Sequence, residues 1–97
     1  MSIKRIEALT GNDQKLAEGI AKDFSKAFGG AFLTEGIGYT EQWETETSYS
    51  ISTYVDEDEQ ALAFEVAYIG VQLRLRHSIE DSVLLTDGNN LAFVERY

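Results

Sequence analysis

The sequence predicts an α+β domain in which one main N-terminal helix packs on an antiparallel sheet of about four to six strands, with a long bulged hairpin. An apolar stripe at helical spacing runs through residues 16–28, and further along the chain the apolar side chains change to a period of two. Turn-forming residues separate the segments of period two, as expected of hairpins. With 97 residues, the chain is expected to form a single domain over residues 1–97.

The N-terminal helix is predicted from its stripe and from signals at both of its ends. Residues 10–13 offer an N-cap, and Gly29 ends the helix because glycine adopts the left-handed conformation without steric cost. Residues 3–9 fit no period, so either a short strand or a single helical turn is expected there. The stripe consists of Leu16, Ile20, Phe24 and Phe28.

A long hairpin with a β-bulge at residues 69–70 is predicted for the middle of the chain. Its first strand alternates from Trp43 to Val55, the acidic residues 56–59 form its turn, and its second strand runs over residues 60–75. This pairing places Trp43 opposite Leu73 on an apolar face and brings Arg74 close to Glu44. Gly36 and Gly38, which precede the hairpin, are expected to lie in a mobile loop.

A second, shorter hairpin is predicted for residues 82–97. Its turn is the segment Asp87-Gly88-Asn89-Asn90, whose residue types tolerate positive φ. In this register Leu84 faces Phe93 and Val83 faces Val94. Residues 77–81 then form the connection from the long hairpin.

Charge is the most uneven property of the chain. It contains 8 Lys and Arg against 17 Asp and Glu, a net charge of -9, and residues 27–73 contain nine of the acids and no Lys or Arg. Direct binding to nucleic acid needs cationic side chains that displace counterions from phosphates, and an anionic membrane needs the same. Both classes of ligand are therefore excluded as direct partners.

The sequence contains no set of residues that indicates catalysis, a cofactor or a metal. There is no Cys, and the single histidine, His77, has no nucleophile motif beside it. The acidic segment 56–59 lacks the glycine and the distant glutamate of a calcium loop, and Gly36-x-Gly38 is followed by no third glycine. We therefore expect a non-enzymatic protein with no cofactor. No signal peptide or membrane-spanning stretch is expected, which predicts a soluble cytoplasmic protein.

The acidic middle segment suggests a binding surface for another protein. Two carboxylates two residues apart on a strand, such as those of Glu44 and Glu46, lie about 6.8 Å apart, which resembles the spacing of successive phosphates. The hypothesis is an inhibitor that docks this hairpin into the basic, nucleic-acid-binding surface of its target, as a DNA mimic. Anti-restriction, anti-CRISPR and nuclease-immunity proteins are settings suggested by analogy. The expected partner-binding residues are Glu41, Glu44, Glu46, Asp56, Glu57, Asp58, Glu59, Tyr39 and Tyr54.

Two other interpretations remain open at this point. The acidic face could serve only to keep a small protein in solution and to protect strand edges from pairing. Alternatively, the chain could be a structural subunit that forms a homodimer through a flat face of small side chains on the predicted long hairpin. That face would contain Ser48, Ser50, Ser52, Ala61, Ala63 and Ala67.

Overall fold

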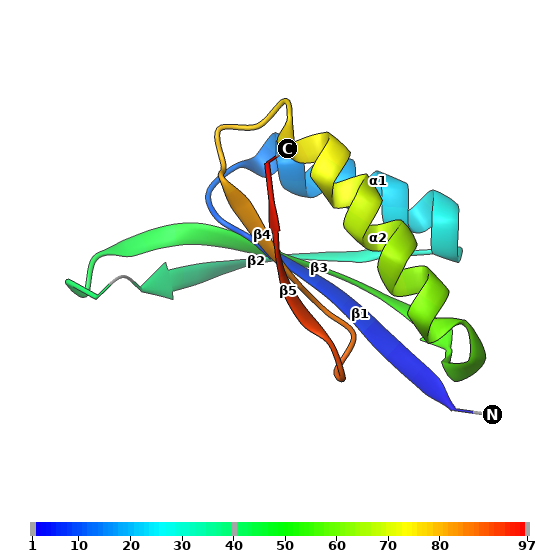
Figure 1. Cartoon of the computed structure of the whole chain (residues 1–97). Coiled ribbons are helices and arrows are strands. Elements are labelled where there is room, and N and C mark those ends of the chain that lie inside the picture. The colour runs from blue at the N-terminus through cyan, green and yellow to red at the C-terminus, as the bar shows by residue number, and fades with distance from the viewer. Residues whose placement is uncertain (1, 40, 97) are drawn as a thin grey trace.

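The computed structural model describes residues 2–39 and 41–96 and contains a five-stranded antiparallel sheet with two helices on one face (Figure 1). The strands lie in the order β2-β3-β1-β4-β5, and the chain order through β4 is strand, helix, strand, strand, helix, strand. This is the ferredoxin-like arrangement, here extended by a fifth strand at one edge. The predicted α+β class and antiparallel sheet are confirmed. Neither helix in the described part of the chain is long and apolar enough to span a membrane.

Helix α1 (Gln14–Phe28) forms where the sequence predicts it. Its N-cap is Asp13, whose Oδ1 accepts a hydrogen bond of 3.1 Å from the backbone N–H of Leu16. Gly29 ends the helix at φ 88°, in the left-handed region. The predicted stripe buries Leu16, Ile20 and Phe24 against the sheet.

Strand β1 (Ile3–Thr10) lies at the centre of the sheet, so the expectation of a strand at residues 3–9 is confirmed over that of a helical turn. The hairpin of β4 (Ser82–Thr86) and β5 (Leu91–Glu95) is confirmed as well. Its register pairs Leu84 with Phe93 and Val83 with Val94, as predicted. Tyr97, which ended the predicted hairpin, lies outside the described residues.

The predicted pairing of residues 42–55 with residues 60–75 is wrong, because residues 60–75 form a second helix. The 3₁₀ turn η1 (Glu57–Glu59) leads into α2 (Gln60–Leu75), so no bulged strand exists there. Large apolar side chains at alternate positions suggested a strand, whereas the helix buries its smaller residues. Ala63, Ala67 and Val71 are 5%, 2% and 1% exposed, and they let α2 pack closely on α1 and the sheet.

The long hairpin of this fold is instead formed by β2 (Phe32–Tyr39) and β3 (Thr45–Asp56). The segment that contains Gly36 and Gly38, expected to be a mobile loop, is therefore an edge strand. Trp43 does not pack on Leu73; it lies in the β2–β3 turn. Arg74 approaches Asp23 of α1 rather than Glu44.

Candidate functional site

The β2–β3 hairpin extends beyond the rest of the sheet as a two-stranded arm (Figure 1). Pairing between β1 and β3 ends at the pair Thr10–Tyr49, whereas pairing between β2 and β3 continues to Tyr39–Thr45. Among the described residues, the segment from Gly36 to Ser48 therefore pairs with no third strand; we call its residues 36–39 and 41–48 the arm. A two-stranded ribbon is at best marginally stable by itself. Packing of the core therefore does not explain why the arm projects into solvent.

Large apolar side chains are exposed along the arm. Ile37 is 70% exposed, Tyr39 69% and Trp43 83%. Trp43 also has a positive φ of 63°, which is uncommon for a bulky residue and marks strained or functional backbone. Aromatic side chains that protrude in this way are typical anchors of protein–protein interfaces. The prediction that Trp43 packs against Leu73 is wrong, because Trp43 is exposed at the tip of the arm.

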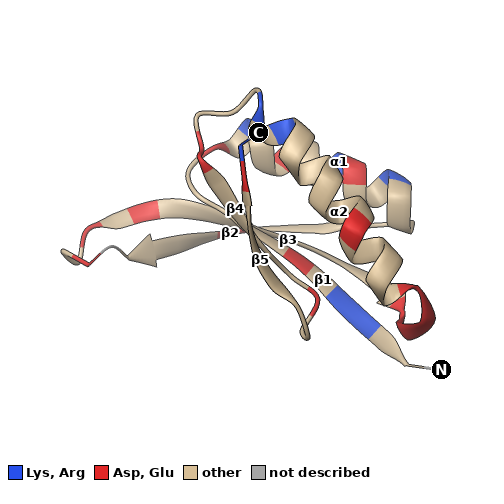
Figure 2. Ribbon diagram, in the orientation of Figure 1, with Lys and Arg blue, Asp and Glu red and all other residues tan. Residues whose placement is uncertain are grey.

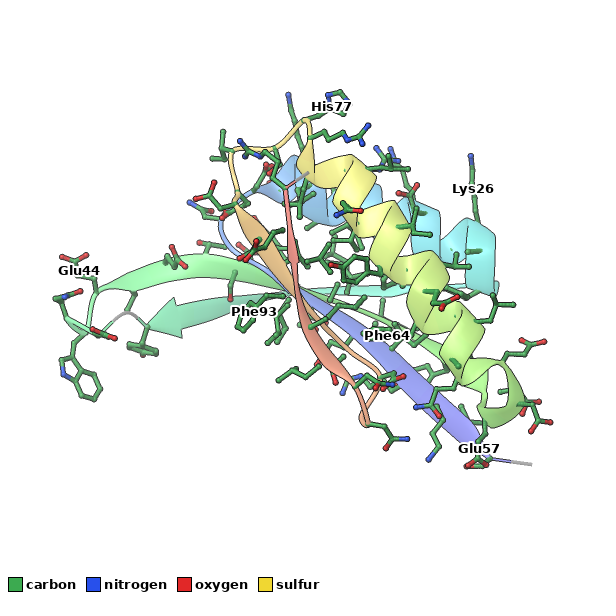
Figure 3. All side chains as sticks on the ribbon, viewed as in Figure 1. Lys26, Glu44, Glu57, Phe64, His77 and Phe93 are labelled. Atoms are coloured by element: carbon green, nitrogen blue, oxygen red, sulfur yellow. The ribbon has the colours of Figure 1, made fainter. Side chains whose placement is uncertain are left out.

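The arm also carries three of the predicted carboxylates. Glu41 and Glu44 lie in the turn, and Glu46 follows on β3; all three are exposed. Figure 2 shows acidic and no basic positions along this part of the ribbon, and Figure 3 shows Glu44 at the far end of the arm. The arm is therefore an anionic projection with aromatic side chains among its carboxylates.

The other predicted partner-binding residues lie at the opposite end of β3. Asp56 ends that strand, and Glu57, Asp58 and Glu59 form the exposed η1 turn (Figure 3). Eleven rises of about 3.3 Å separate the two ends of β3, so Thr45 and Asp56 lie at most about 36 Å apart. The nine predicted residues thus form two groups, one on the arm and one at the start of α2. Tyr54 belongs to the second group, where its ring lies 6.3 Å from that of Phe32.

The sheet face opposite the helices is partly apolar, in line with the apolar side chains on both faces of the hairpin at residues 82–97. Leu9 pairs beside Leu84, and Leu84 beside Phe93, in one row across three strands. Phe93 is 66% exposed, and the neighbouring Leu91 is 68% exposed. Strands β4 and β5 carry apolar side chains on both faces, and this pattern in the sequence indicates the surface.

The predicted face of small Ser and Ala side chains does not exist as one surface. Tyr49 and Ile51 are buried under the helices. The serines that alternate with them therefore lie on the opposite face of the sheet; they are Ser48, Ser50 and Ser52. Ala63 and Ala67 are buried on the inner side of α2, and Ala61 is exposed at its start. The flat dimer face predicted from the hairpin register is therefore wrong.

His77 lines a cleft between the start of α1 and the end of α2. The neighbouring Ser78 hydroxyl donates a 2.6 Å hydrogen bond to Asp13 Oδ2, so it is engaged with a carboxylate rather than with His77. This hydrogen bond lowers the pKa of Asp13, while partial burial opposes the shift. Within the described residues, no three His, Asp or Glu side chains gather as metal ligands.

Comparisons with known proteins show a likeness of fold only. No protein-family model matches the chain, and neither does any curated protein sequence. A phage SAM lyase, solved in its apo state, is 11% identical with a TM-score of 0.58; the match covers 96% of this chain and 82% of that one. A de novo designed protein with a ferredoxin fold is 16% identical over 96% of this chain and 85% of its own, with a TM-score of 0.40.

Proposed function

We propose that this chain is a non-enzymatic protein that binds and inhibits another protein through its acidic arm. The observation that supports the proposal most strongly is the composition of the arm: Tyr39 and Trp43 are 69% and 83% exposed beside the carboxylates of Glu41, Glu44 and Glu46. A sequence selected only for solubility would have no reason to expose tryptophan and tyrosine on an unsupported ribbon. The combination suits a partner with a basic groove and an apolar pocket.

Each kind of side chain has a separate role in this proposal. The carboxylates steer the arm towards a positive surface and raise the rate of association. The aromatic rings supply the contact area that slows dissociation, because buried Trp and Tyr dominate the binding energy of many interfaces. The carboxylates therefore govern the salt dependence of binding, and the rings govern the lifetime of the complex.

A nucleic-acid-handling protein is the target class that we favour. The two acidic groups lie near the ends of β3, which are at most about 36 Å apart, a length comparable to one turn of duplex DNA, about 34–36 Å. This spacing supports a DNA mimic of the anti-restriction, anti-CRISPR or nuclease-immunity kind, acting in the cytoplasm. The absence of cysteine fits that compartment.

Affinity capture from the source cell with three matched baits tests the proposal. The baits are the unchanged chain, an arm variant with Glu44→Lys and Glu46→Lys, and an η1 variant with Asp58→Lys and Glu59→Lys, which carries the same charge change at the other end of β3. We expect a basic protein that the unchanged chain retains and that high salt releases. The arm variant should lose it. Loss with the η1 variant as well would support a DNA mimic that uses both acidic groups, and retention by the η1 variant would restrict the site to the arm. Equal retention by all three baits would contradict a role for the arm, and loss with the η1 variant alone would move the site to η1.

A second candidate is a small enzyme that acts on S-adenosylmethionine. The observations that favour it are the shared fold with a phage SAM lyase and the cleft lined by His77 and Asp13. Incubation of the chain with S-adenosylmethionine, followed by chromatography of the products, distinguishes the two candidates. Cleavage by the unchanged chain and its loss in His77→Ala would establish the enzyme. If S-adenosylmethionine stays intact, the result favours the binding protein over the enzyme.

A further inference from the structure

Helix α2 is apolar on its outer side as well as on its inner side. Its inner residues are buried, yet Leu62 is 65% exposed, Val66 43%, Ile69 57% and Leu73 50%. Spacings of four, three and four residues place these side chains in one stripe, like the seam of a coiled coil. We call this set the outer α2 stripe. A helix that is apolar all round is normally buried on all sides.

We propose that two copies of this chain form a two-fold symmetric dimer in which the outer α2 stripes pack against each other in antiparallel orientation. The spacing of the stripe is the same when read from either end. In an antiparallel pair with its two-fold axis between positions 67 and 68, Leu62 of each copy faces Leu73 of the other. The same axis places Val66 opposite Ile69. A two-fold interface requires this self-complementarity.

The charges at the ends of α2 favour the same orientation. The η1 residues Glu57, Asp58 and Glu59 precede the helix, and Arg76 and Arg74, the latter also paired with Asp23 of α1, lie at its other end. Antiparallel packing places the acidic start of each helix beside the basic end of its partner. It also opposes the two helix dipoles. A parallel pair would bring like charges together at both ends.

Gly70, on the flank of the stripe, provides an independent observation. A glycine inside a helix costs about 1 kcal/mol relative to alanine. A Cβ added at Gly70 would meet no side chain or backbone from another part of the chain within 4 Å, so no tertiary contact within one copy requires this glycine. Close approach of a second helix explains it, because the missing side chain leaves room beside the seam.

The dimer is expected to be weak and is independent of the proposed inhibitory function. One face of a 16-residue helix supplies less than the roughly 800 Å² per partner of a standard interface. Two copies of net charge -9 also repel each other, although salt near 0.15 M screens that repulsion beyond about 8 Å. We therefore expect the dimer to have a dissociation constant in the micromolar range.

Sedimentation velocity from about 1 µM to about 1 mM in 0.15 M salt tests the proposal. The mass should rise from 10.8 kDa towards twice that value. Ile69→Glu and, separately, Leu73→Glu should each keep the protein monomeric at all concentrations, with circular dichroism unchanged. Leu91→Glu introduces the same charge on the open sheet face and should leave the dimer intact. A monomer at every concentration would overturn the proposal, as would a dimer broken by Leu91→Glu but not by Ile69→Glu.

Engineered cysteines test the orientation, because the chain has none of its own. Chains with Val66→Cys are mixed with chains carrying Ile69→Cys and oxidised. The antiparallel pair predicts that the mixed disulfide forms at least tenfold faster than a disulfide between two Val66→Cys chains. Faster linkage between identical positions would contradict the antiparallel geometry.

Discussion

Arg74 of α2 lies across Gly19 of α1 and holds Asp23 in a two-bond ion pair. Its Nε and Nη2 donate hydrogen bonds of 2.8 and 2.9 Å to the two carboxylate oxygens. A Cβ added at Gly19 would lie 3.0–3.1 Å from the Arg74 side chain, so the glycine provides the path for the guanidinium. The hydrogen bonds from Arg74 lower the pKa of Asp23, against the opposing effect of partial burial. This contact links α1 to α2 at the surface of the helix pair.

Gly19→Ala should therefore bring two opposing changes. Alanine favours the helix by up to about 1 kcal/mol, while displacement of Arg74 weakens an ion pair whose side chains are 45% and 36% exposed. An exposed pair contributes about 0.2–1 kcal/mol, so the free energy of unfolding should change little. The pKa of Asp23, measured by NMR, should rise towards its ordinary value. An unchanged pKa together with a gain near 1 kcal/mol would show that Arg74 does not depend on Gly19.

The N-cap of α1 gives a second prediction. Asp13 accepts hydrogen bonds from the Leu16 N–H and from the Ser78 hydroxyl, and so joins the start of α1 to the segment after α2. Asp13→Ala should lower the free energy of unfolding by about 1–2 kcal/mol. Asp13→Asn keeps a capping oxygen and should cost less. Urea denaturation measures both variants, and equal losses would show that the charge of Asp13, rather than its cap, matters.

Asp87 predicts how stability depends on pH. Its side chain is 2% exposed, and burial is the largest single effect on its pKa and raises it. Hydrogen bonds from Asn90 and Asn89 together outweigh burial, so the pKa of Asp87 is lowered overall. A carboxyl whose pKa is lower in the folded state stabilises the protein above its unfolded pKa of about 3.9 and loses that effect as pH falls.

Thermal denaturation between about pH 6 and about pH 2.5 measures this effect. The melting temperature should fall below about pH 4 in the unchanged chain. Asp87→Asn should be less stable at neutral pH and should lose less stability on acidification. A parallel fall in both proteins would assign the acid sensitivity to other carboxyls, such as those of Asp13 and Asp23.

The arm should contribute little to the stability of the body. Its carboxylates are exposed, and exposed substitutions rarely change stability by more than about 0.5 kcal/mol. The combined Glu44→Lys and Glu46→Lys variant should therefore unfold at nearly the same urea concentration as the unchanged chain. A large loss would mean that the arm is part of the folded core, and the capture experiment would then need a milder variant.

The elements predicted correctly are those with local signals that agree. In α1 the stripe, the cap and Gly29 all point to one helix, and in the β4–β5 hairpin the turn around Asp87 sets the register that pairs Leu84 with Phe93. The antiparallel α+β class follows from these elements together with the alternation of β3. Each of these signals lies within a single helix, strand or hairpin, so no contact between distant segments was needed to interpret them.

The second helix could not be assigned from periodicity, because it is apolar on two sides. Leu62, Phe64, Val66 and Tyr68 alternate as in a strand, and only the alanines between them favour a helix. Because residues 60–75 were predicted as the strand that pairs with β3, the true partner strand, β2, was not predicted, and neither was the arm. Edge strands rich in glycine, such as β2, carry weak sequence signals. The division of the candidate carboxylates between the two ends of β3 depends on this pairing, so the sequence did not predict it.

Fluorescence of Trp43 during titration with the captured partner tests the central claim most directly. Trp43 is the single tryptophan of the chain and lies 83% exposed on the arm, so its emission reports on this site alone. If the partner has tryptophans, 5-fluorotryptophan in this chain and ¹⁹F NMR give the same information. Binding through the arm predicts a blue-shifted emission, or a shifted ¹⁹F line, with protection from acrylamide that high salt reverses. A complex that forms while the Trp43 signal and its quenching stay unchanged would contradict the account.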